Sequence, residues 1–209
     1  MKLILTDPDA TVVDAWRAQF LKRPEVEIRT DPILDAKASA IILPGANSFG
    51  FLDSGVALEA SERYGWALEE AIRQRIQAEF DGELLVGQAA VITRADLPWK
   101  LVYSPVWRTP RKLGGTIHVF LAVRGALLAL RKAMGDAAES VTVALPGFGV
   151  TDGGGLDARI SARQSRYAYE VVNGLRGPGD KNLTQQMRRE RKLMLVPGID
   201  RELEEADGS

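Results

Sequence analysis

Polar residues and glycines gather at two corners of the chain, each where an apolar run gives way to a helical pattern. The first corner is "LPGANSFGFLDSGVALEA", residues 43–60, and the second is "VALPGFGVTDGGGLD", residues 143–157. Glycine allows a sharp turn and lets backbone N–H groups approach a ligand closely. The start of a helix adds unpaired N–H donors and the positive end of the helix dipole. Each corner can therefore bind an anion such as a phosphate without using a lysine.

Two such corners on one sheet predict a shared binding site. If the strands before them are neighbours in an open sheet, both loops stand at the carboxyl ends of the strands, where α/β proteins bind ligands. A ligand with two phosphates, or with a diphosphate between two sugars, would fill that crevice. The alternative for either corner alone is an ordinary glycine-containing turn.

The elements that must position these corners follow an α/β order. Short β-rich runs alternate with longer segments of helical period, which is typical of a layered α/β fold. About six strands are expected, at residues 2–5, 26–29, 40–43, 84–93, 100–103 and 141–145. Helices are expected at residues 10–22, at 55–80 with a break near Gly65, at 116–134 and at 156–172.

The chain after residue 175 has a different character. "RGPGDKN" is rich in turn residues, "LTQQMRRERKLM" fits one amphipathic helix, and "DRELEEADGS" is acidic with almost nothing apolar to bury. We therefore expect residues 1–175 to form one α/β domain and residues 176–209 to form a polar C-terminal extension. The extension either packs back on the domain, mediates self-association or stays mobile.

Composition excludes several classes of protein. The 209 residues are 45% hydrophobic, which suffices for one sizeable core, and the net charge of -1 leaves nucleic-acid binding dependent on a local patch. The chain has no cysteine and one histidine, His118, so cysteine chemistry and a histidine metal cluster are excluded. The apolar run before Asp7 is too short for a signal peptide or a membrane span. A soluble, cytoplasmic protein without a membrane partner is expected.

Four segments resemble, in order and with the right spacing, the macro domain, a family that binds ADP-ribose and related nucleotides. They are "ASAIILPGANSFGFLDSGVALEASERYG", "GQAAVITRADLPWKLVYSPV", "GGTIHVFLAVRGALLAL" and "VALPGFGVTDGGGLD". The resemblance implies a three-layer α/β sandwich, with a central mixed sheet of about six strands and helices on both faces. It implies ADP-ribose or an ADP-ribosylated macromolecule as the partner, nucleic acid only as a modified substrate, and neither a metal nor a cofactor.

Carried over position by position, the resemblance implies a set of binding residues. Asp31 would accept a hydrogen bond from the adenine amino group, and Asn47 would bind the hydroxyls of the distal ribose. Gly55 and Val56 would offer backbone N–H groups to a phosphate at the helix start. Phe148 would either cover a sugar or face the core. The second loop as a whole would wrap the diphosphate and the distal ribose with Gly147, Phe148, Gly149, Val150 and Thr151.

Departures from the family pattern bear on catalysis. The usual two asparagines of the first loop are reduced to one, and Ala57 stands where the branch that hydrolyses ADP-ribosyl links commonly has an aspartate. A general base would then come from elsewhere, and Asn47, Asp53 and Asp152 are the candidates for catalysis. Three functions stay open: hydrolysis of an ADP-ribosyl linkage at the distal ribose, binding of ADP-ribose or a related nucleotide without turnover, and a structural role with a vestigial crevice.

Two smaller groups of residues carry alternatives of their own. "WKLVYSPVWRTPRK", residues 99–112, places three aromatic rings among basic residues, a combination that suits single-stranded nucleic acid. The simpler interpretation is a basic loop at the mouth of the crevice that attracts an anionic ligand. Asp7 and Asp9, in "ILTDPDA", are interpreted as helix-capping residues.

Overall fold

A central six-stranded sheet organises the computed structural model, which describes residues 1–150, 154–175 and 182–197. The strand order is β2-β1-β6-β3-β5-β4, with every neighbouring pair parallel except the β4–β5 pair at one edge. The strands are β1 (Lys2–Thr6), β2 (Glu27–Arg29), β3 (Ala40–Gly45), β4 (Ala90–Ile92), β5 (Lys100–Pro105) and β6 (Thr142–Leu145). The mixed sheet expected from the sequence is thus confirmed.

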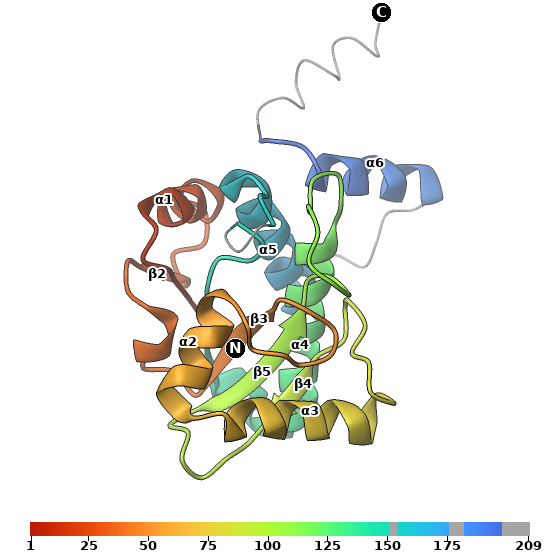
Figure 1. The fold of residues 1–209 in the computed structure, drawn as a ribbon. Coiled ribbons are helices and arrows are strands. Elements are labelled where there is room, and N and C mark those ends of the chain that lie inside the picture. The colour runs from red at the N-terminus through yellow and green to blue at the C-terminus, as the bar shows by residue number, and fades with distance from the viewer. Residues whose placement is uncertain (151–153, 176–181, 198–209) are drawn as a thin grey trace, which may run out of the picture.

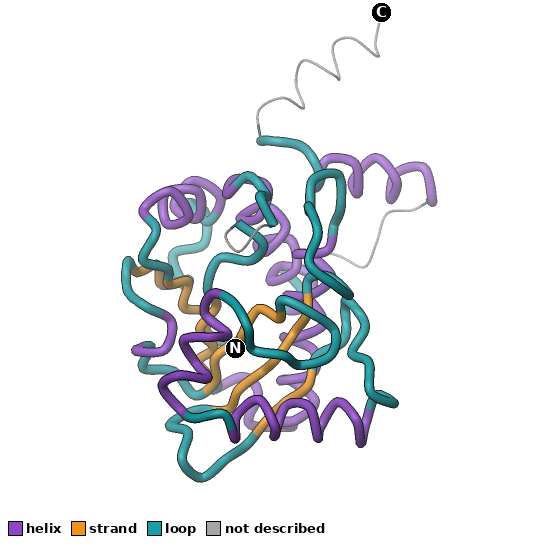
Figure 2. Tube along the Cα trace, viewed as in Figure 1, coloured by secondary structure: helices purple, strands orange, loops and turns teal. Residues whose placement is uncertain are grey.

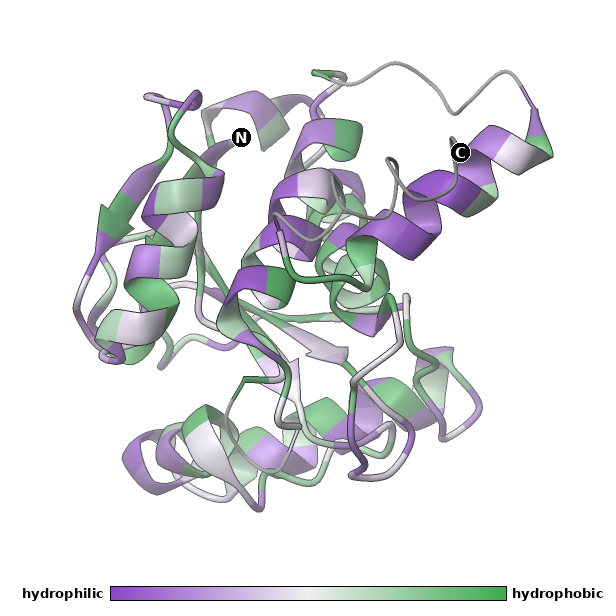
Figure 3. Ribbon diagram, turned by 90° about the horizontal axis from the view of Figure 1, so that it is seen from above, coloured by the Kyte–Doolittle hydropathy of each residue, from purple (hydrophilic) through white to green (hydrophobic). Residues whose placement is uncertain are grey.

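Helices cover both faces of the sheet and make a three-layer sandwich (Figures 1 and 2). The helices are α1 (Ala10–Gln19), α2 (Gly55–Tyr64), α3 (Ala67–Glu79), α4 (His118–Met134), α5 (Ala158–Val172) and α6 (Leu183–Leu193), with short 3-10 turns η1 (Ile33–Asp35) and η2 (Gly135–Ser140). Viewed along the sheet in Figure 3, α2 and α3 lie on one face and α1, α4 and α5 on the other.

Successive side chains of each strand point to opposite faces of the sheet, which explains why two cores form. In β3, Ala40 and Ile42 pack into the core under α1, α4 and α5, whereas Ile41 and Leu43 pack into the core under α2 and α3. Successive side chains of a strand point to opposite faces, so a run of consecutive apolar residues is buried on both sides. The uninterrupted apolar character of "AIIL" therefore reflects a central position in the sheet.

One expected strand is much shorter than the sequence suggests. Residues 84–93 were expected as a strand, but only Ala90–Ile92 pairs in the sheet. Gly87 has a φ of 98°, and the Leu85 N–H donates to the side-chain oxygen of Gln88 at 2.9 Å, so the chain turns here. The apolar residues before it fold over the sheet edge, with the Leu84 N–H bonded to the Ser48 carbonyl at 2.9 Å.

Other expected elements agree with the structure. The break near Gly65 is confirmed: α2 ends at Tyr64, and Gly65 adopts a φ of 80° before α3. The segment "LTQQMRRERKLM" forms α6, whose N-cap residue is Asn182, with a side chain that accepts from the Gln185 N–H. The division into a domain of residues 1–175 and an extension of residues 176–209 stays a prediction. No helix in the described ranges combines the length and apolar character that a membrane crossing needs.

Helix α4 approaches the sheet edge closely because Gly125 lacks a side chain. A methyl group placed on Gly125 would lie 2.2 Å from the carbonyl oxygen of Gly87. We therefore expect Gly125→Ala to lower the free energy of unfolding by about 1–3 kcal/mol, as overpacking does, although alanine favours a helix. Urea denaturation measures this change.

The matched control is Ala133→Gly, at an exposed position of the same helix. It changes helix propensity without altering a buried contact and should cost about 0.5–1 kcal/mol. A stabilised Gly125→Ala protein would contradict the close packing of α4 on Gly87.

Candidate functional site

Parallel pairing of β3 with β6 brings the two corners of the chain together. Ala40 pairs with Val143 and Ile41 with Ala144, so the carboxyl ends of both strands lie side by side, at the same end of the sheet. A cavity of about 250 Å³ lies there, between the two loops. The described residues that line it are Asp7, Pro8, Pro44, Gly45, Ala46, Ser54, Gly55, Val56, Ala57, Glu59, Val106, Trp107, Gly147 and Gly149. The sequence correctly predicted this juxtaposition of glycine loops.

The first loop is shaped from within by Asn47. Its side-chain oxygen accepts from the N–H groups of Phe49 at 3.0 Å and Phe51 at 3.1 Å, and its Nδ2 donates to the Phe51 carbonyl at 2.8 Å. Asn47 is only 5% exposed and does not line the cavity. The Asn47 side chain thus forms hydrogen bonds within its own loop, and the expected contact with a ribose stays a prediction.

Aromatic side chains from β5 and from the residues just after it fix the base of the same loop. The Tyr103 hydroxyl donates to the Asn47 carbonyl at 2.7 Å, and Trp107 Nε1 donates to the Ala46 carbonyl. The tyrosine ring lies so close to Gly45 that a methyl group there would be 2.6 Å from Cζ. Burial raises the pKa of the Tyr103 phenol above its ordinary value, so the hydroxyl remains a donor at neutral pH.

The start of α2 supplies unpaired donors to the cavity. Ser54 is the N-cap residue but makes no side-chain capping bond, and Gly55 enters the helix with a φ of 51°. The backbone N–H groups of Gly55, Val56 and Ala57 bond to no acceptor in the described part of the chain. These three residues and Ser54 line the cavity. An anion in the cavity would satisfy the donors and meet the positive end of the helix dipole.

The second loop is tied to two neighbouring elements and closed by a hydrogen bond of its own. The Gly147 N–H donates to Asp7 Oδ2 at 2.9 Å, and the Ser161 hydroxyl donates to the Phe148 carbonyl at 2.8 Å. The Leu156 N–H closes the loop by donating to the Gly149 carbonyl at 3.0 Å. Gly147 and Gly149 therefore present a fixed backbone to the cavity, opposite the start of α2.

Several solved structures that share this architecture are macrodomains. No protein-family model matches the sequence, and no curated protein sequence is similar enough to count as a relative. The macrodomain of Mycobacterium tuberculosis DarG superposes with a TM-score of 0.53 at 22% identity, over 68% of this chain and 88% of that one. The macrodomain of Thermus aquaticus DarG superposes with a TM-score of 0.55 at 20% identity, over 69% of this chain and 89% of that one. The chain has the macrodomain fold.

A third structure with this fold was solved with a ligand. Thermosipho africanus DarTG in complex with ADP-ribose matches with a TM-score of 0.51 at 12% identity, over 90% of this chain and 56% of that one. At these identities the similarity establishes the fold, and the chemistry of this chain must be judged from its own residues.

The residues expected to bind the ligand in the second loop differ in how deeply they are buried. Phe148 is fully buried, so of the two positions expected for it the structure shows the one that faces the core. Val150 is half-buried against the same core. Thr151 and Asp152, expected to contact the ligand and to act in catalysis, lie outside the described residues.

Asp7 is a site residue that the sequence analysis missed. Asp9 caps α1 as expected, by accepting from the Thr11 N–H at 2.8 Å. Asp7 does not cap the helix, because its two oxygens accept from the N–H groups of Asp9 and Gly147, both at 2.9 Å. Its position directly after the first strand was the available signal, since the ends of parallel strands share one edge of the sheet.

The remaining candidate carboxylates lie around the cavity rather than in it. Asp53 is exposed and does not line the cavity, and among the described lining residues the carboxylates are those of Asp7 and Glu59. Asp31 follows β2, and its carbonyl accepts from the Thr6 hydroxyl at 2.6 Å, so it stands at the same sheet edge beside the end of β1. Within the described ranges no group of three or more acidic or histidine side chains is placed to hold a metal ion.

The aromatic rings of residues 99–112 are not available for stacking. Trp99, Tyr103 and Trp107 are at most 5% exposed, so the interpretation as a single-strand stacking surface is wrong. The basic residues that follow them are exposed on loop 108–117, between β5 and α4. His118 Nδ1 lies 2.9 Å from the Val106 carbonyl at the start of α4, consistent with a packing or capping role.

Replacing Asn47 tests how far the first loop depends on its side chain. In Asn47→Ala the N–H groups of Phe49 and Phe51 lose the acceptor of two part-buried hydrogen bonds, so we expect the free energy of unfolding to fall by about 2–4 kcal/mol. Asn173→Ala is the control, because that amide also bonds to a backbone carbonyl but is half-exposed, and it should cost about 1 kcal/mol or less. Equal costs would contradict the structural role of Asn47.

Tyr103 makes the free energy of unfolding depend on pH in the alkaline range. The folded chain holds the phenolic proton more tightly than the unfolded chain, where tyrosine titrates near pH 10. Its contribution is therefore present below about pH 10 and is lost as the pH rises through that value toward the raised folded pKa. Tyr103→Phe should cost about 1 kcal/mol at pH 7 and lose less stability between pH 9 and 11 than the parent. Parallel curves from urea denaturation would contradict this.

Proposed function

We propose that this chain binds ADP-ribose, or a derivative of it, in the cavity between the two glycine loops. The observation that carries the proposal is the uncapped start of α2, where three N–H groups without acceptors face a second glycine loop across a cavity. A diphosphate is the anion that two such facing loops fit. The macrodomain fold adds support, because Thermosipho africanus DarTG, which shares it, was solved with ADP-ribose.

The proposal gives each part of the ligand a place. The diphosphate lies between the N–H groups of Gly55 and Val56 and the backbone of Gly147 and Gly149. The adenine extends along the sheet edge toward Asp31, past the end of β1. The distal ribose then lies over the floor formed by Gly45, Ala46 and Trp107, and whatever macromolecule is linked to that ribose remains outside the cavity.

Hydrolysis of an ADP-ribosyl linkage at the distal ribose is the second candidate function. It is favoured by the carboxylates of Asp7 and Glu59 in the cavity wall, since a carboxylate can act as a general base. Asp7 already accepts two backbone bonds, whereas Glu59 is exposed. Of the residues named from the sequence, Asp53 remains a candidate through its place beside the first loop. Incubation with ADP-ribosylated protein, ADP-ribosylated DNA and terminally phosphorylated ADP-ribose separates turnover from binding alone.

A carboxylate placed at the start of α2 tests the binding proposal without harming the fold. Ser54→Asp puts a good N-cap residue at a position that lines the cavity, so the melting temperature should be kept or raised. The added charge occupies the anion site and repels a diphosphate, so the Kd for ADP-ribose should rise at least about ten-fold. Isothermal titration calorimetry measures the Kd.

Ser54→Asn is the matched control, because asparagine caps a helix equally well but carries no charge. Its Kd for ADP-ribose should stay within about three-fold of the parent, since no charge repulsion is added. Equal affinities for Ser54→Asp and the parent would place the phosphates elsewhere. Failure of the parent to bind ADP-ribose, AMP or NAD would overturn the proposal and favour a structural role.

A further inference from the structure

Helix α6 is strongly basic although the protein as a whole is not. The net charge of the chain is -1, yet α6 carries Arg188, Arg189, Arg191 and Lys192 against the single acidic residue Glu190. Figure 3 shows this helix as hydrophilic along most of its length. A local excess of positive charge is what the sequence analysis required of any surface that binds a polyanion.

A groove between α5 and α6 concentrates this charge. The groove has a volume of about 410 Å³ and also reaches the end of α1. Its lining residues are Gln19, Arg163, Arg166, Tyr167, Glu170, Gln185, Arg188, Arg189, Lys192 and Leu193. Five of them are basic and one is acidic. That acidic residue, Glu170, is buried and is bound by Arg23 at 2.9 Å and Arg166 at 2.8 Å, so it does little to offset the remaining charges.

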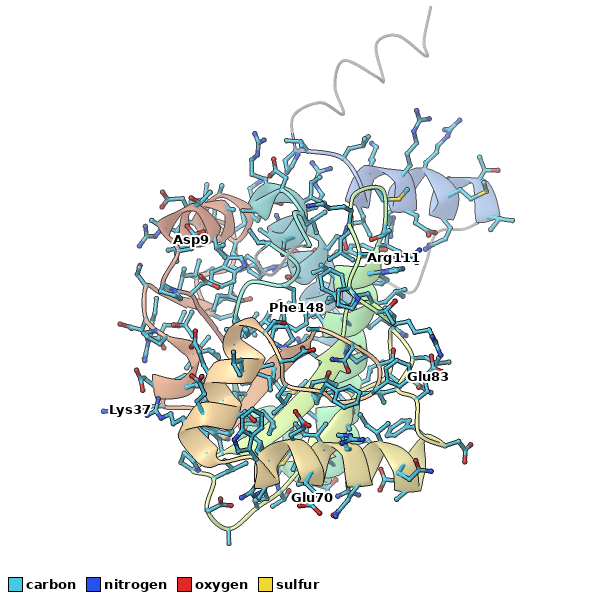
Figure 4. The ribbon with its side chains drawn as sticks, in the orientation of Figure 1. Asp9, Lys37, Glu70, Glu83, Arg111 and Phe148 are labelled. Carbon is cyan, nitrogen blue, oxygen red and sulfur yellow. The ribbon has the colours of Figure 1, made fainter. Side chains whose placement is uncertain are left out.

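The basic surface continues from α6 onto loop 108–117. The Gln164 side chain is fully buried and donates both to the Thr116 carbonyl at 2.8 Å and to the Leu193 carbonyl at 3.1 Å. One amide therefore fastens the end of the loop to the end of α6. The loop carries Arg111 and Lys112, and Figure 4 shows Arg111 near α6. We call α5, α6 and loop 108–117, which meet at Gln164, the basic surface.

Several cations of this surface are available to a ligand. Arg188, Arg191, Arg111 and Lys112 are exposed and form no ion pair with any other described residue. Arg188 and Arg191 are three residues apart on α6, so they lie on the same side of the helix. Exposed arginines in a row can bind successive phosphates, because the planar guanidinium matches phosphate oxygens with two hydrogen bonds.

We propose that the basic surface of α5, α6 and loop 108–117 binds the phosphodiester backbone of a nucleic acid. The residues that line its groove do not line the cavity between the glycine loops, and the proposal does not depend on the function proposed for that cavity. Because the aromatic rings near the surface are buried, binding is electrostatic and independent of sequence. A lipid membrane fits less well, because the exposed apolar residues of α6 are only Leu183 and Met187, at its first turns.

Anisotropy titrations of labelled 20-nucleotide oligonucleotides, single-stranded and duplex, test this proposal with the full chain. We expect a Kd in the range of about 1–100 μM near physiological salt, with affinity falling as salt rises. The double variant Arg188→Glu with Arg191→Glu should weaken binding at least about ten-fold and flatten the slope of log Kd against log salt by about 1.4–1.8. The two arms show whether single strands or duplexes are preferred.

The matched control is the double variant Lys37→Glu with Lys132→Glu, which changes the net charge by the same amount. Lys37 lies at the opposite side of the molecule from α6 in Figure 4, and Lys132 is near the end of α4, about 20 Å from its start. This variant should change the Kd no more than about two-fold, because charges beyond a Debye length are largely screened. Circular dichroism melts confirm that both variants fold.

Two measurements distinguish oligonucleotide binding at the basic surface from ADP-ribose binding in the cavity. Saturating ADP-ribose and the Ser54→Asp variant should leave oligonucleotide binding unchanged. The proposal is overturned if neither oligonucleotide binds at about 50 mM salt, because electrostatic binding is stronger there than at physiological salt. It is also overturned if the control variant weakens binding as much as the α6 variant, or if the chain binds anionic vesicles but no oligonucleotide.

Discussion

The parallel hydrogen bonding between β3 and β6 is the constraint on which the candidate site depends. These strands are 100 residues apart in the chain, yet Ala40 lies beside Val143 and both strands run in the same direction. Their loops must therefore leave the sheet at one edge. With β1 on the other side of β6, the first strand adds Asp7 to that edge as a third contributor. A change that broke this pairing would separate the loops whatever their own residues.

Side chains that look suited to a ligand serve mainly to hold the loops in this structure. Asn47 and Asp7 accept backbone N–H groups, Ser161 holds the Phe148 carbonyl, and Tyr103 holds the base of the first loop. At the described residues around the cavity, the backbone N–H groups at the start of α2 are left without an acceptor. A site built in this way is rigid before the ligand arrives, so little binding energy is lost in ordering it. Its specificity then lies in the shape of the backbone, which many loop sequences can produce.

The sequence predicted the layers, the order of most elements and the two facing glycine loops, because apolar runs, helical periods and glycine corners are local patterns. It failed where the deciding partner is distant in the chain. The bond between Asp7 and Gly147 spans 140 residues, and the turn at Gly87 packs against Gly125 of α4. Residues 84–89 do not show that the strand begins only at Ala90, and nothing near Asn47 shows that its amide is used by its own loop. Such contacts exist only once the sheet has formed.

The most direct test of the account follows the backbone amides during a titration with ADP-ribose by ¹⁵N NMR. The account predicts that the amide signals of Gly55, Val56 and Gly149 shift together with a single Kd, whereas those of α6 do not move. Shifts confined to other parts of the molecule, or none at saturating ligand, would contradict the claim that the uncapped start of α2 and the second glycine loop bind the diphosphate.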